Sequence, residues 1–463
     1  MTVYWFGQGF SMLSWDGADL ERRLCRALDI AKKTINHFGI QGYVDETSPA
    51  LSFGPEKPLA ETAMLIYAAS VCRHRPDIAS RVDELAKLMS PLARSERVLA
   101  DIALHPALAF KFALPHVLLT KLGYPDARFD DFLRSCQLSK TSNGHDRPPS
   151  ASLEKSWISS LWAGGQVRGV AWRLNLRDSV LNWPVDILGG LRDDVYAFTH
   201  LIFYCTDFGF QASRLRRRRS AILREASSLL SRSLDAEDYD LAGEILLAWP
   251  LTDAAWAPAA AFGFRVLASI EDQAGTLPGG NVDPARLLKL EGGKRNRYAL
   301  GTAYHTAYVM GFICAASLRP GRAPPVKVVG PRFDRSCLSQ LLYYVADDQG
   351  HWQPEFSKLT ANEQLALTPF ILDTAIVQAC RRHQYEALNE ILSLGCSYKV
   401  AVSPMCRQAV ELLERIANCS SAAHTRTHTD DQVSLPATLA GLNKKYRGTQ
   451  GSRTIATASR ARR

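Results

Sequence analysis

The chain has 463 residues, of which 46% are hydrophobic and 22% charged, and it carries a formal net charge of +9. This length suits two or three compact domains, and the composition excludes a disordered or collagen-like chain. The most apolar stretches, near residues 254–268 and 303–318, are interrupted by Pro258, Arg265 or His305. Neither offers the roughly 18 uninterrupted apolar residues of a membrane span, so none is expected.

The ends of the chain and its cysteines favour a cytoplasmic protein. The first ten residues, MTVYWFGQGF, lack a basic start followed by an apolar core, so we expect no secretory signal. Ten cysteines are spread along the chain, and the two nearest in sequence are Cys396 and Cys406. Without a CxxC pair, neither a structural zinc module nor a disulfide framework is expected.

Helical periodicity dominates the chain from its start. Residues 20–38 place an apolar stripe on one face, after Asp16 and Asp19, which are typical helix-capping residues. The only short strand candidate is 326–329. Further amphipathic helices are expected at 60–73, 78–89, 94–122, 128–136, 154–162, 193–208, 215–234, 236–248, 256–271, 297–318, 336–347, 363–382, 387–394 and 406–417.

Composition shifts predict four segments: an N-terminal helical domain at 1–138, a linker at 139–153, a helical domain at 154–420 and a tail at 421–463. The linker is rich in polar residues, proline and glycine. The tail carries +6 of the net charge and has little periodic apolar content, so we expect it to be disordered. Because the remaining body is nearly neutral, nucleic acid is not expected as a partner.

A faint internal repeat indicates how the helices are arranged. Residues 112–116 read FALPH, residues 196–200 read YAFTH, and Tyr304-His305 is a weaker third copy. Repeats at intervals of about 80–110 residues are typical of helical hairpins wound into an α/α toroid or solenoid. We therefore predict an all-α fold of this kind.

The candidate site consists of two apolar helical runs that carry an unusual number of polar side chains. Tyr196, His200, Tyr204 and Asp207 lie at relative positions 0, 4, 8 and 11 of the run YAFTHLIFYCTDFG, and so share one helical stripe. The run YHTAYVMG at 304–311 adds His305 to a second such helix. Buried polar groups without partners cost roughly 1–3 kcal/mol each, so both runs are expected to face a shared cavity.

Several chemistries fit these residues. His200 is suited to general acid/base work, with Asp207 to orient it and Tyr204 and His305 to complete the set. His200, Asp207 and His305 are also a possible metal set, but seven residues separate the first two by roughly 10 Å, so no metal is assigned. A structural role, in which the groups bond one another, also stays open. The expected substrate contacts are Tyr196, Thr199, Tyr304, Thr306 and Tyr308.

A basic run, Arg214 with Arg216–Arg219, precedes the helix expected at 215–234. A solvated helix start explains it better than a phosphate-binding stripe, because the helix continues through apolar residues.

The two polar runs resemble those of a family of bacterial helical proteins of unassigned function, encoded near natural-product genes. The shared patterns are Y-x-x-T-H-x-x-F-Y-x-T-D-F-G, matched at 196–209, and Y-H-T-x-x-x-x-G, matched at 304–311. The resemblance covers about residues 150–420 and implies a toroid-like fold and a role in specialised metabolism. Terpene cyclases and lanthionine-forming cyclases are more distantly similar. The chain lacks the DxDD-type acid of the former and the paired-cysteine zinc site of the latter.

Together these observations predict an accessory enzyme of small-molecule biosynthesis, of the antibiotic or specialised-metabolite kind, with an acid/base site in a helical cavity. The competing hypothesis is a non-catalytic scaffold that presents a pathway intermediate or binds a pathway protein. No cofactor can be specified.

Overall fold

A computed structural model describes residues 15–164, 175–212, 215–345 and 352–424. The fold is all-α, as predicted, with 72% helix and no strand among these residues. The strand predicted at 326–329 is wrong, because that segment forms bends and coil without a ladder partner. An isolated antiparallel bridge joins Tyr43 to Phe53.

The chain forms two compact units, which are described separately. The first comprises Met1–Pro331 and Asp347–Leu367, and the second Arg332–Ala346 and Thr368–Arg463. The helices of the first unit are α1 (Gly17–Phe38), α2 (Glu56–Ala69), α3 (Pro76–Ala93), α4 (Glu96–Leu104), α5 (Ala109–Lys121), α6 (Ala127–Gln137), α7 (Pro149–Trp162), α9 (Arg192–Thr206), α10 (Arg219–Asp235), α11 (Tyr239–Leu246), α12 (Ala248–Leu251), α13 (Pro258–Ala274), α14 (Pro284–Lys289), α15 (Gly292–Ser317), α17 (Trp352–Ser357) and α18 (Ala361–Ala366). Those of the second are α16 (Arg335–Tyr344), α19 (Thr368–Arg381), α20 (Tyr385–Ser397) and α21 (Pro404–His424).

Local sequence signals explain where many helices begin. The predicted cap Asp16 is confirmed, since its side chain accepts hydrogen bonds from the backbone N–H groups of Ala18 and Asp19 at 3.0 and 2.9 Å. Proline occupies the first position of α3, α7, α13 and α14, where its missing N–H costs nothing.

Two long predicted helices are interrupted, and each interruption coincides with a proline. The segment 94–122 forms α4 and α5, which are separated at His105 and Pro106. The segment 363–382 forms α18 and α19, which are separated next to Pro369. Proline disfavours helical geometry in the residue before it, which explains the break at His105. Pro369 has no N–H to donate, so it cannot continue the hydrogen bonds of α18.

The segment expected to be a structureless linker, 139–153, is partly helical. Residues Lys140–Asn143 form a 3-10 turn, and α7 begins at Pro149. Composition alone missed this start, because proline is a helix breaker only beyond the first turn. The basic tail predicted at 421–463 lies outside the described residues, apart from the end of α21.

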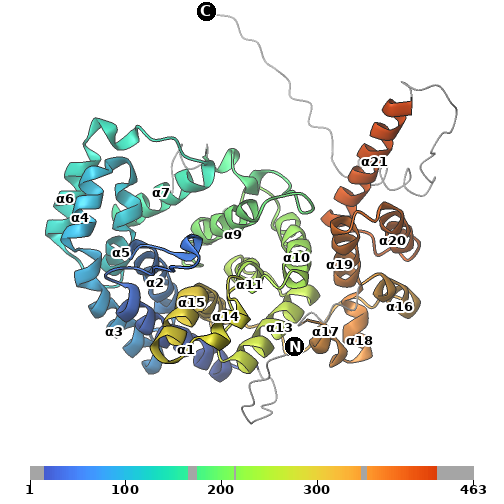
Figure 1. The fold of residues 1–463 in the computed structure, drawn as a ribbon, viewed down its shortest axis with the longest axis horizontal. Helices are drawn as coiled ribbons and strands as arrows, with labels where there is room; N and C mark the ends of the chain where they lie inside the picture. Colours follow the sequence, from blue (N-terminus) through green and yellow to red (C-terminus); the bar gives the residue numbers. More distant parts are fainter. Residues whose placement is uncertain (1–14, 165–174, 213–214, 346–351, 425–463) are drawn as a thin grey trace, which may run out of the picture. The chain divides into compact units, whose positions relative to one another are not determined.

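Six helices of the first unit contact one another in a closed circuit (Figure 1). In chain order α2 contacts α5, α5 contacts α7, α7 contacts α9, α9 contacts α11, α11 contacts α15, and α15 returns to α2. Helices α1, α3, α4, α10 and α13 each pack against members of this circuit. Segments more than 200 residues apart in sequence are thereby brought together.

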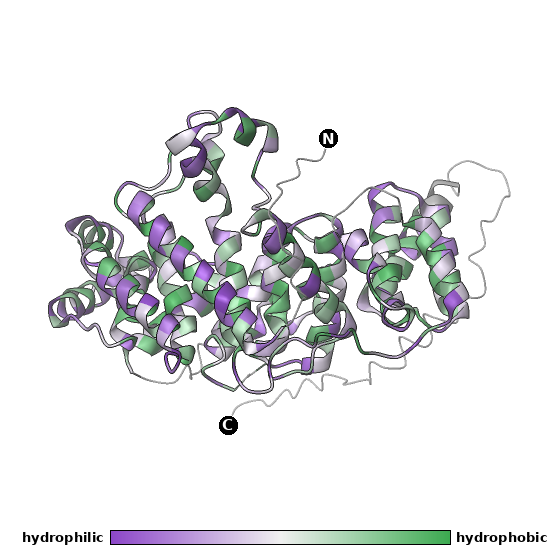
Figure 2. Ribbon diagram, turned by 90° about the horizontal axis from the view of Figure 1, so that it is seen from below, coloured by the Kyte–Doolittle hydropathy of each residue, from purple (hydrophilic) through white to green (hydrophobic). Residues whose placement is uncertain are grey.

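Figure 2 shows hydrophobic residues alternating with hydrophilic ones along most helices, as expected when each helix buries one face. No single helix of the described chain is long and apolar enough to cross a membrane. The bent pair Glu96–Leu104 and Pro106–Lys121, at 111° to each other, meets the length and composition criteria together. In the fold α5, which belongs to this pair, packs against α2 and α7.

Candidate active site

A cavity of about 530 Å³ opens between α2, α9, α11 and α15 of the closed circuit. This volume falls in the range of small-molecule sites. Two loops, at 50–53 and 279–281, contribute to its wall. The lining residues are Ala50, Leu51, Ser52, Phe53, Lys57, Glu61, Arg192, Tyr196, His200, Asp240, Glu244, Gly279, Gly280, Asn281, Gly301, Thr302, Tyr304, His305 and Thr306.

An ion pair in the cavity joins α15 to α11. His305 Nδ1 lies 2.7 Å from Asp240 Oδ1, and the Tyr196 hydroxyl donates to Asp240 Oδ2 at 2.6 Å. Burial lowers the pKa of His305, but Asp240, Glu61 and Glu244 raise it by more, to about 10. Burial alone would raise the pKa of Asp240, whereas His305 and Tyr196 bring it well below its usual range. The pair is therefore an imidazolium and a carboxylate at neutral pH.

The second nitrogen of His305 lies near two more carboxylates. Its Nε2 atom is 3.9 Å from Glu61 Oε1 and 4.0 Å from Glu244 Oε1. Glu244 also lies 3.4 Å from His200 Nε2 and accepts a hydrogen bond from Thr199 at 2.6 Å. Burial lowers the pKa of His200, and Glu244 raises it above the usual value. Both imidazoles thus converge on Glu244 from different helices.

A glycine explains how α11 and α15 bring Asp240 to His305. Asp240 and Glu244 are four residues apart and share one face of α11. Gly243 lies between them, and a Cβ atom at that position would be 2.5 Å from Val309 Cγ1 of α15. Without a side chain at 243, the two helix backbones approach closely.

Three residues of α9 follow the predicted stripe into the cavity: Arg192, Tyr196 and His200, each four residues after the last. Arg192 is held in place by hydrogen bonds of 2.7 and 2.8 Å to Asp238, and its guanidinium lies 5.0 Å from the centre of the Tyr196 ring. This end of the wall is therefore fixed by α11.

Two buried polar atoms of the cavity have no hydrogen-bond partner among the described residues. They are the hydroxyl of Tyr304, a residue only 2% exposed, and Oε2 of Glu61. Burial and the nearby Glu61 carboxylate raise the pKa of Tyr304 far above its usual value. Such atoms are expected where a ligand or water completes the site.

Asp207 and Tyr204 do not line the cavity. Helix α9 ends at Thr206, and Asp207 adopts a left-handed conformation with φ 48°. Its carboxylate accepts hydrogen bonds from Trp157 Nε1 at 2.8 Å and from the Tyr67 hydroxyl at 3.2 Å. The Tyr204 hydroxyl donates to Glu154 at 3.1 Å. The predicted stripe fails at its last two positions, so Asp207 does not orient His200.

The other predicted contacts divide between the cavity and the core. Tyr196, Tyr304 and Thr306 line the cavity. Thr199 is buried and reaches the site only through Glu244. Tyr308 is fully buried, and its hydroxyl lies 2.8 Å from the Thr62 hydroxyl, so it joins α15 to α2.

Among the described residues, no group of three or more His, Cys, Asp or Glu side chains has the arrangement of a metal site. The alternative of His200, Asp207 and His305 as ligands also fails on geometry, because the Asp207 carboxylate is bonded to Trp157 and Tyr67.

Sequence reasoning missed the carboxylates that accompany the histidines: Asp240, Glu244 and Glu61. All three lie in strongly apolar helical runs, LAETAMLIYAA and DLAGEILLAWP. The criterion that singled out 196–209, polar groups inside an apolar helix, also applies to them.

His116 of α5, which lies in the first copy of the sequence repeat, is a structural residue. It is fully buried, with Nε2 2.9 Å from Asp130 Oδ1 and Nδ1 accepting from Arg94 at 3.1 Å. Burial lowers its pKa below the usual value. It offers a comparison for His305, since it makes a similar carboxylate contact without lining the cavity.

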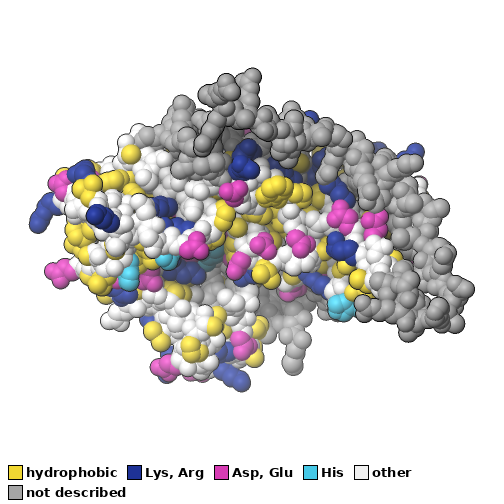
Figure 3. Space-filling model, turned by 90° about the horizontal axis from the view of Figure 1, so that it is seen from above, with side chains coloured by type: hydrophobic (Ala, Val, Ile, Leu, Met, Phe, Trp, Pro, Cys, Tyr) yellow, Lys and Arg dark blue, Asp and Glu magenta, His cyan; other side chains and the backbone are white. Residues whose placement is uncertain are grey.

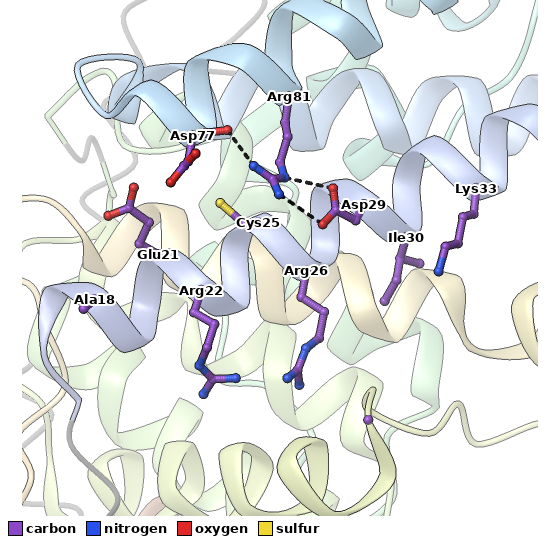
Figure 4. Close-up of a pocket in the computed structure, with 11 residues that line it drawn as sticks. Ala18, Glu21, Arg22, Cys25, Arg26, Asp29, Ile30, Lys33, Asp77 and Arg81 are labelled. Atoms are coloured by element: carbon purple, nitrogen blue, oxygen red, sulfur yellow. Dashed lines mark hydrogen bonds and ion pairs between the residues drawn. The ribbon is translucent and has the colours of Figure 1, made fainter. Parts of the chain in front are cut away.

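A larger hollow, of about 730 Å³, lies along the outer face of α1 (Figure 4). In its lining, Arg81 donates to Asp29 at 2.8 Å and to the backbone carbonyl of Asp77 at 3.1 Å. The hollow offers no buried unpartnered acceptor like those of Glu61 and Tyr304, so we do not regard it as the functional site.

On the face in Figure 3, the Lys and Arg side chains of the described chain lie among acidic ones. In the basic run, Arg217 pairs with the buried Glu225, and Arg219 donates to the Thr252 carbonyl at 2.8 Å. Arg214 lies outside the described residues.

The fold and the cavity define a helical protein with a histidine–carboxylate pocket in a closed circuit of helices. The chain belongs to the family described as Domain of unknown function (DUF6895), whose match spans residues 24–315. The match includes every residue that lines the cavity, and it begins earlier and ends earlier than the region of about 150–420 expected from the two motifs. Comparisons with curated proteins and with solved structures gave no match.

Proposed function

We propose that the protein is an accessory enzyme of specialised-metabolite biosynthesis that transfers protons to and from a small molecule in this cavity. The observation that carries the proposal is His305, which binds Asp240 through Nδ1 and lies about equally far from Glu61 and Glu244 through Nε2. An acid and a base side by side in a partly enclosed site suit proton transfer, as in isomerisation, elimination or cyclisation.

Each residue then has a distinct role. His305 is the general acid, because its raised pKa keeps it protonated at neutral pH. Glu244 is the general base, and Thr199 fixes one of its oxygens at 2.6 Å. Asp240 is a positioning residue that holds the His305 ring through Nδ1. His200 and Tyr196 position the substrate.

We further propose that the closed circuit is an α/α-toroid-like ring. The support is that six helices in chain order meet neighbour to neighbour and the last returns to the first, while other helices pack against them. In such a ring the cavity would be an opening along the ring axis. We propose a cytoplasmic protein, in which this opening is accessible to a soluble intermediate.

The second candidate is a non-catalytic scaffold that binds a pathway intermediate or protein. The buried hydrogen bonds of Thr199, Tyr196 and Asp240 favour it, since a network of this kind also holds helices in register. The two functions predict different results when the His305 imidazole is removed: the product is lost if the protein is an enzyme and is retained if it is a scaffold.

The test is metabolite profiling of a strain that carries the gene, after deletion and complementation. Wild type and His37→Gln, an exposed histidine of α1, should restore the product, and His305→Gln should not, although it folds. Full restoration by His305→Gln would overturn the enzymatic proposal and favour the scaffold.

A further inference from the structure

Of the three carboxylates that line the cavity, Glu61 has the loosest contacts with cations. Asp240 lies 2.7 Å from His305 Nδ1 and 3.9 Å from Arg192, and Glu244 lies 3.4 Å from His200 Nε2. The cations nearest to Glu61 are His305 Nε2 and the half-exposed Lys57, each 3.9 Å from its Oε1 atom, which is beyond hydrogen-bond distance. Glu61 is therefore the carboxylate of the cavity that is most open to a cationic ligand.

The neighbouring groups also suit a cation. Glu61 Oε2 and the Tyr304 hydroxyl are buried and interact with each other, and neither atom has another partner among the described residues. Aromatic rings of Phe53, Tyr196 and Tyr304 belong to the same wall. Carboxylate oxygens with aromatic faces are the usual environment of bound ammonium groups, whereas a ligand carboxylate or phosphate placed against Glu61 would meet repulsion.

We infer that the cavity binds its small-molecule substrate through a protonated amine that Glu61 and the Tyr304 hydroxyl receive. This inference rests on the proposed function, because it takes the cavity to be the substrate site. It adds the chemical class of the substrate. With the amine at Glu61, the atoms that exchange protons lie toward His305 Nε2, 3.9 Å from Glu61 Oε1.

Calorimetric titration with three matched compounds tests the inference: 2-phenylethylamine, 2-phenylethanol and 3-phenylpropionate. They share an aromatic ring and a short chain and differ in charge. The amine should bind wild type about tenfold more tightly than the alcohol, and the carboxylate should not bind, since a charge-assisted hydrogen bond is about twice as strong as a neutral one.

Two variants assign the effect to Glu61. Glu61→Gln should lose the preference for the amine, while Glu56→Gln, an exposed residue of the same helix outside the cavity, should keep it. If Glu61→Gln does not fold, Tyr304→Phe should weaken amine binding several-fold. Three results would overturn the inference. The first is equal affinity of the wild-type protein for the amine and the alcohol, and the second is no amine binding at about 10 mM, a range in which even weak fragments bind. The third is a Glu61→Gln variant that keeps the preference for the amine.

The outcomes separate this inference from the proposed function. If amines fail to bind but His305→Gln still abolishes the product, proton transfer stands and the substrate is not an amine. If amines bind through Glu61 but His305→Gln restores the product, the cavity is a binding site without the proposed catalysis.

Discussion

His305 of α15 and Asp240 of α11 form an ion pair 65 residues apart in sequence, with Nδ1 and Oδ1 separated by 2.7 Å. Asp240 is 8% exposed, and the imidazole is also largely shielded from solvent. The pair connects two helices of the closed circuit and presents the other imidazole nitrogen to the cavity.

The stability of the protein should fall as the pH rises through the His305 titration. Its folded-state pKa, about 10, is raised above the value of about 6.5 in an unfolded chain. The pair therefore contributes fully below about pH 6.5, and the contribution is lost as the pH rises toward 10. Urea unfolding from pH 6 to 10 should show a steeper loss in wild type than in His305→Gln. Parallel curves would contradict the assignment.

Gly243→Ala should destabilise the first unit. The added Cβ would lie 2.5 Å from Val309 Cγ1, so α11 and α15 must move apart, at a cost of about 1–3 kcal/mol in unfolding free energy. Gly293→Ala in α15 is the matched control, because a Cβ there meets nothing within 4 Å. Chemical denaturation measures both, and equal midpoints for the two variants would refute close packing at residue 243.

Asp207→Ala should destabilise the protein without acting on the chemistry. Alanine removes the acceptor of Trp157 and Tyr67 and disfavours the left-handed φ of 48°, which together should cost about 1–3 kcal/mol or more. Asp207→Asn keeps an acceptor oxygen and tolerates this conformation, so it should be milder. Thermal unfolding ranks the two. Loss of product in Asp207→Asn with unchanged stability would return Asp207 to the site.

Arg286→Ala should loosen the loop that contributes Phe53 to the cavity. Arg286 Nη1 donates to the buried Asp45 at 2.8 Å, which ties this loop to α14. The pKa of Asp45, which burial would raise, is held well below its usual range by Arg286 and Tyr43. Faster amide exchange at residues 43–53 is expected in the variant, and Arg81→Ala, which removes a partly exposed arginine of α3, should leave that loop unchanged. Equal exchange in both would show that Asp45 does not need Arg286.

Much of the fold could be predicted from the sequence because helix periodicity and capping are local. The stripe from Tyr196 to His200 follows from spacing alone, and both residues line the cavity with His305. The stripe fails at Asp207 for a local reason as well: this left-handed residue ends α9 and so leaves the helical face. Tyr204 is still helical, but its hydroxyl donates to Glu154 of α7.

The carboxylate partners depend on tertiary packing, which the spacing of residues does not encode. Glu61 and His305 are 244 positions apart and approach because α2 and α15 close the circuit. The close approach at Gly243 is equally nonlocal, since its reason is Val309 on another helix. A buried-polar criterion applied to every apolar helix would have marked Glu61, Asp240 and Glu244, but not which histidine each one contacts.

The most direct measurement is a titration of His305 by nitrogen-15 NMR in the purified protein, in wild type and in Asp240→Asn. In wild type, the imidazole should stay doubly protonated through neutral pH and titrate near pH 10, and in Asp240→Asn its pKa should fall. A wild-type imidazole that titrates near 6.5, unchanged by Asp240→Asn, would contradict a charged acid at the centre of this cavity.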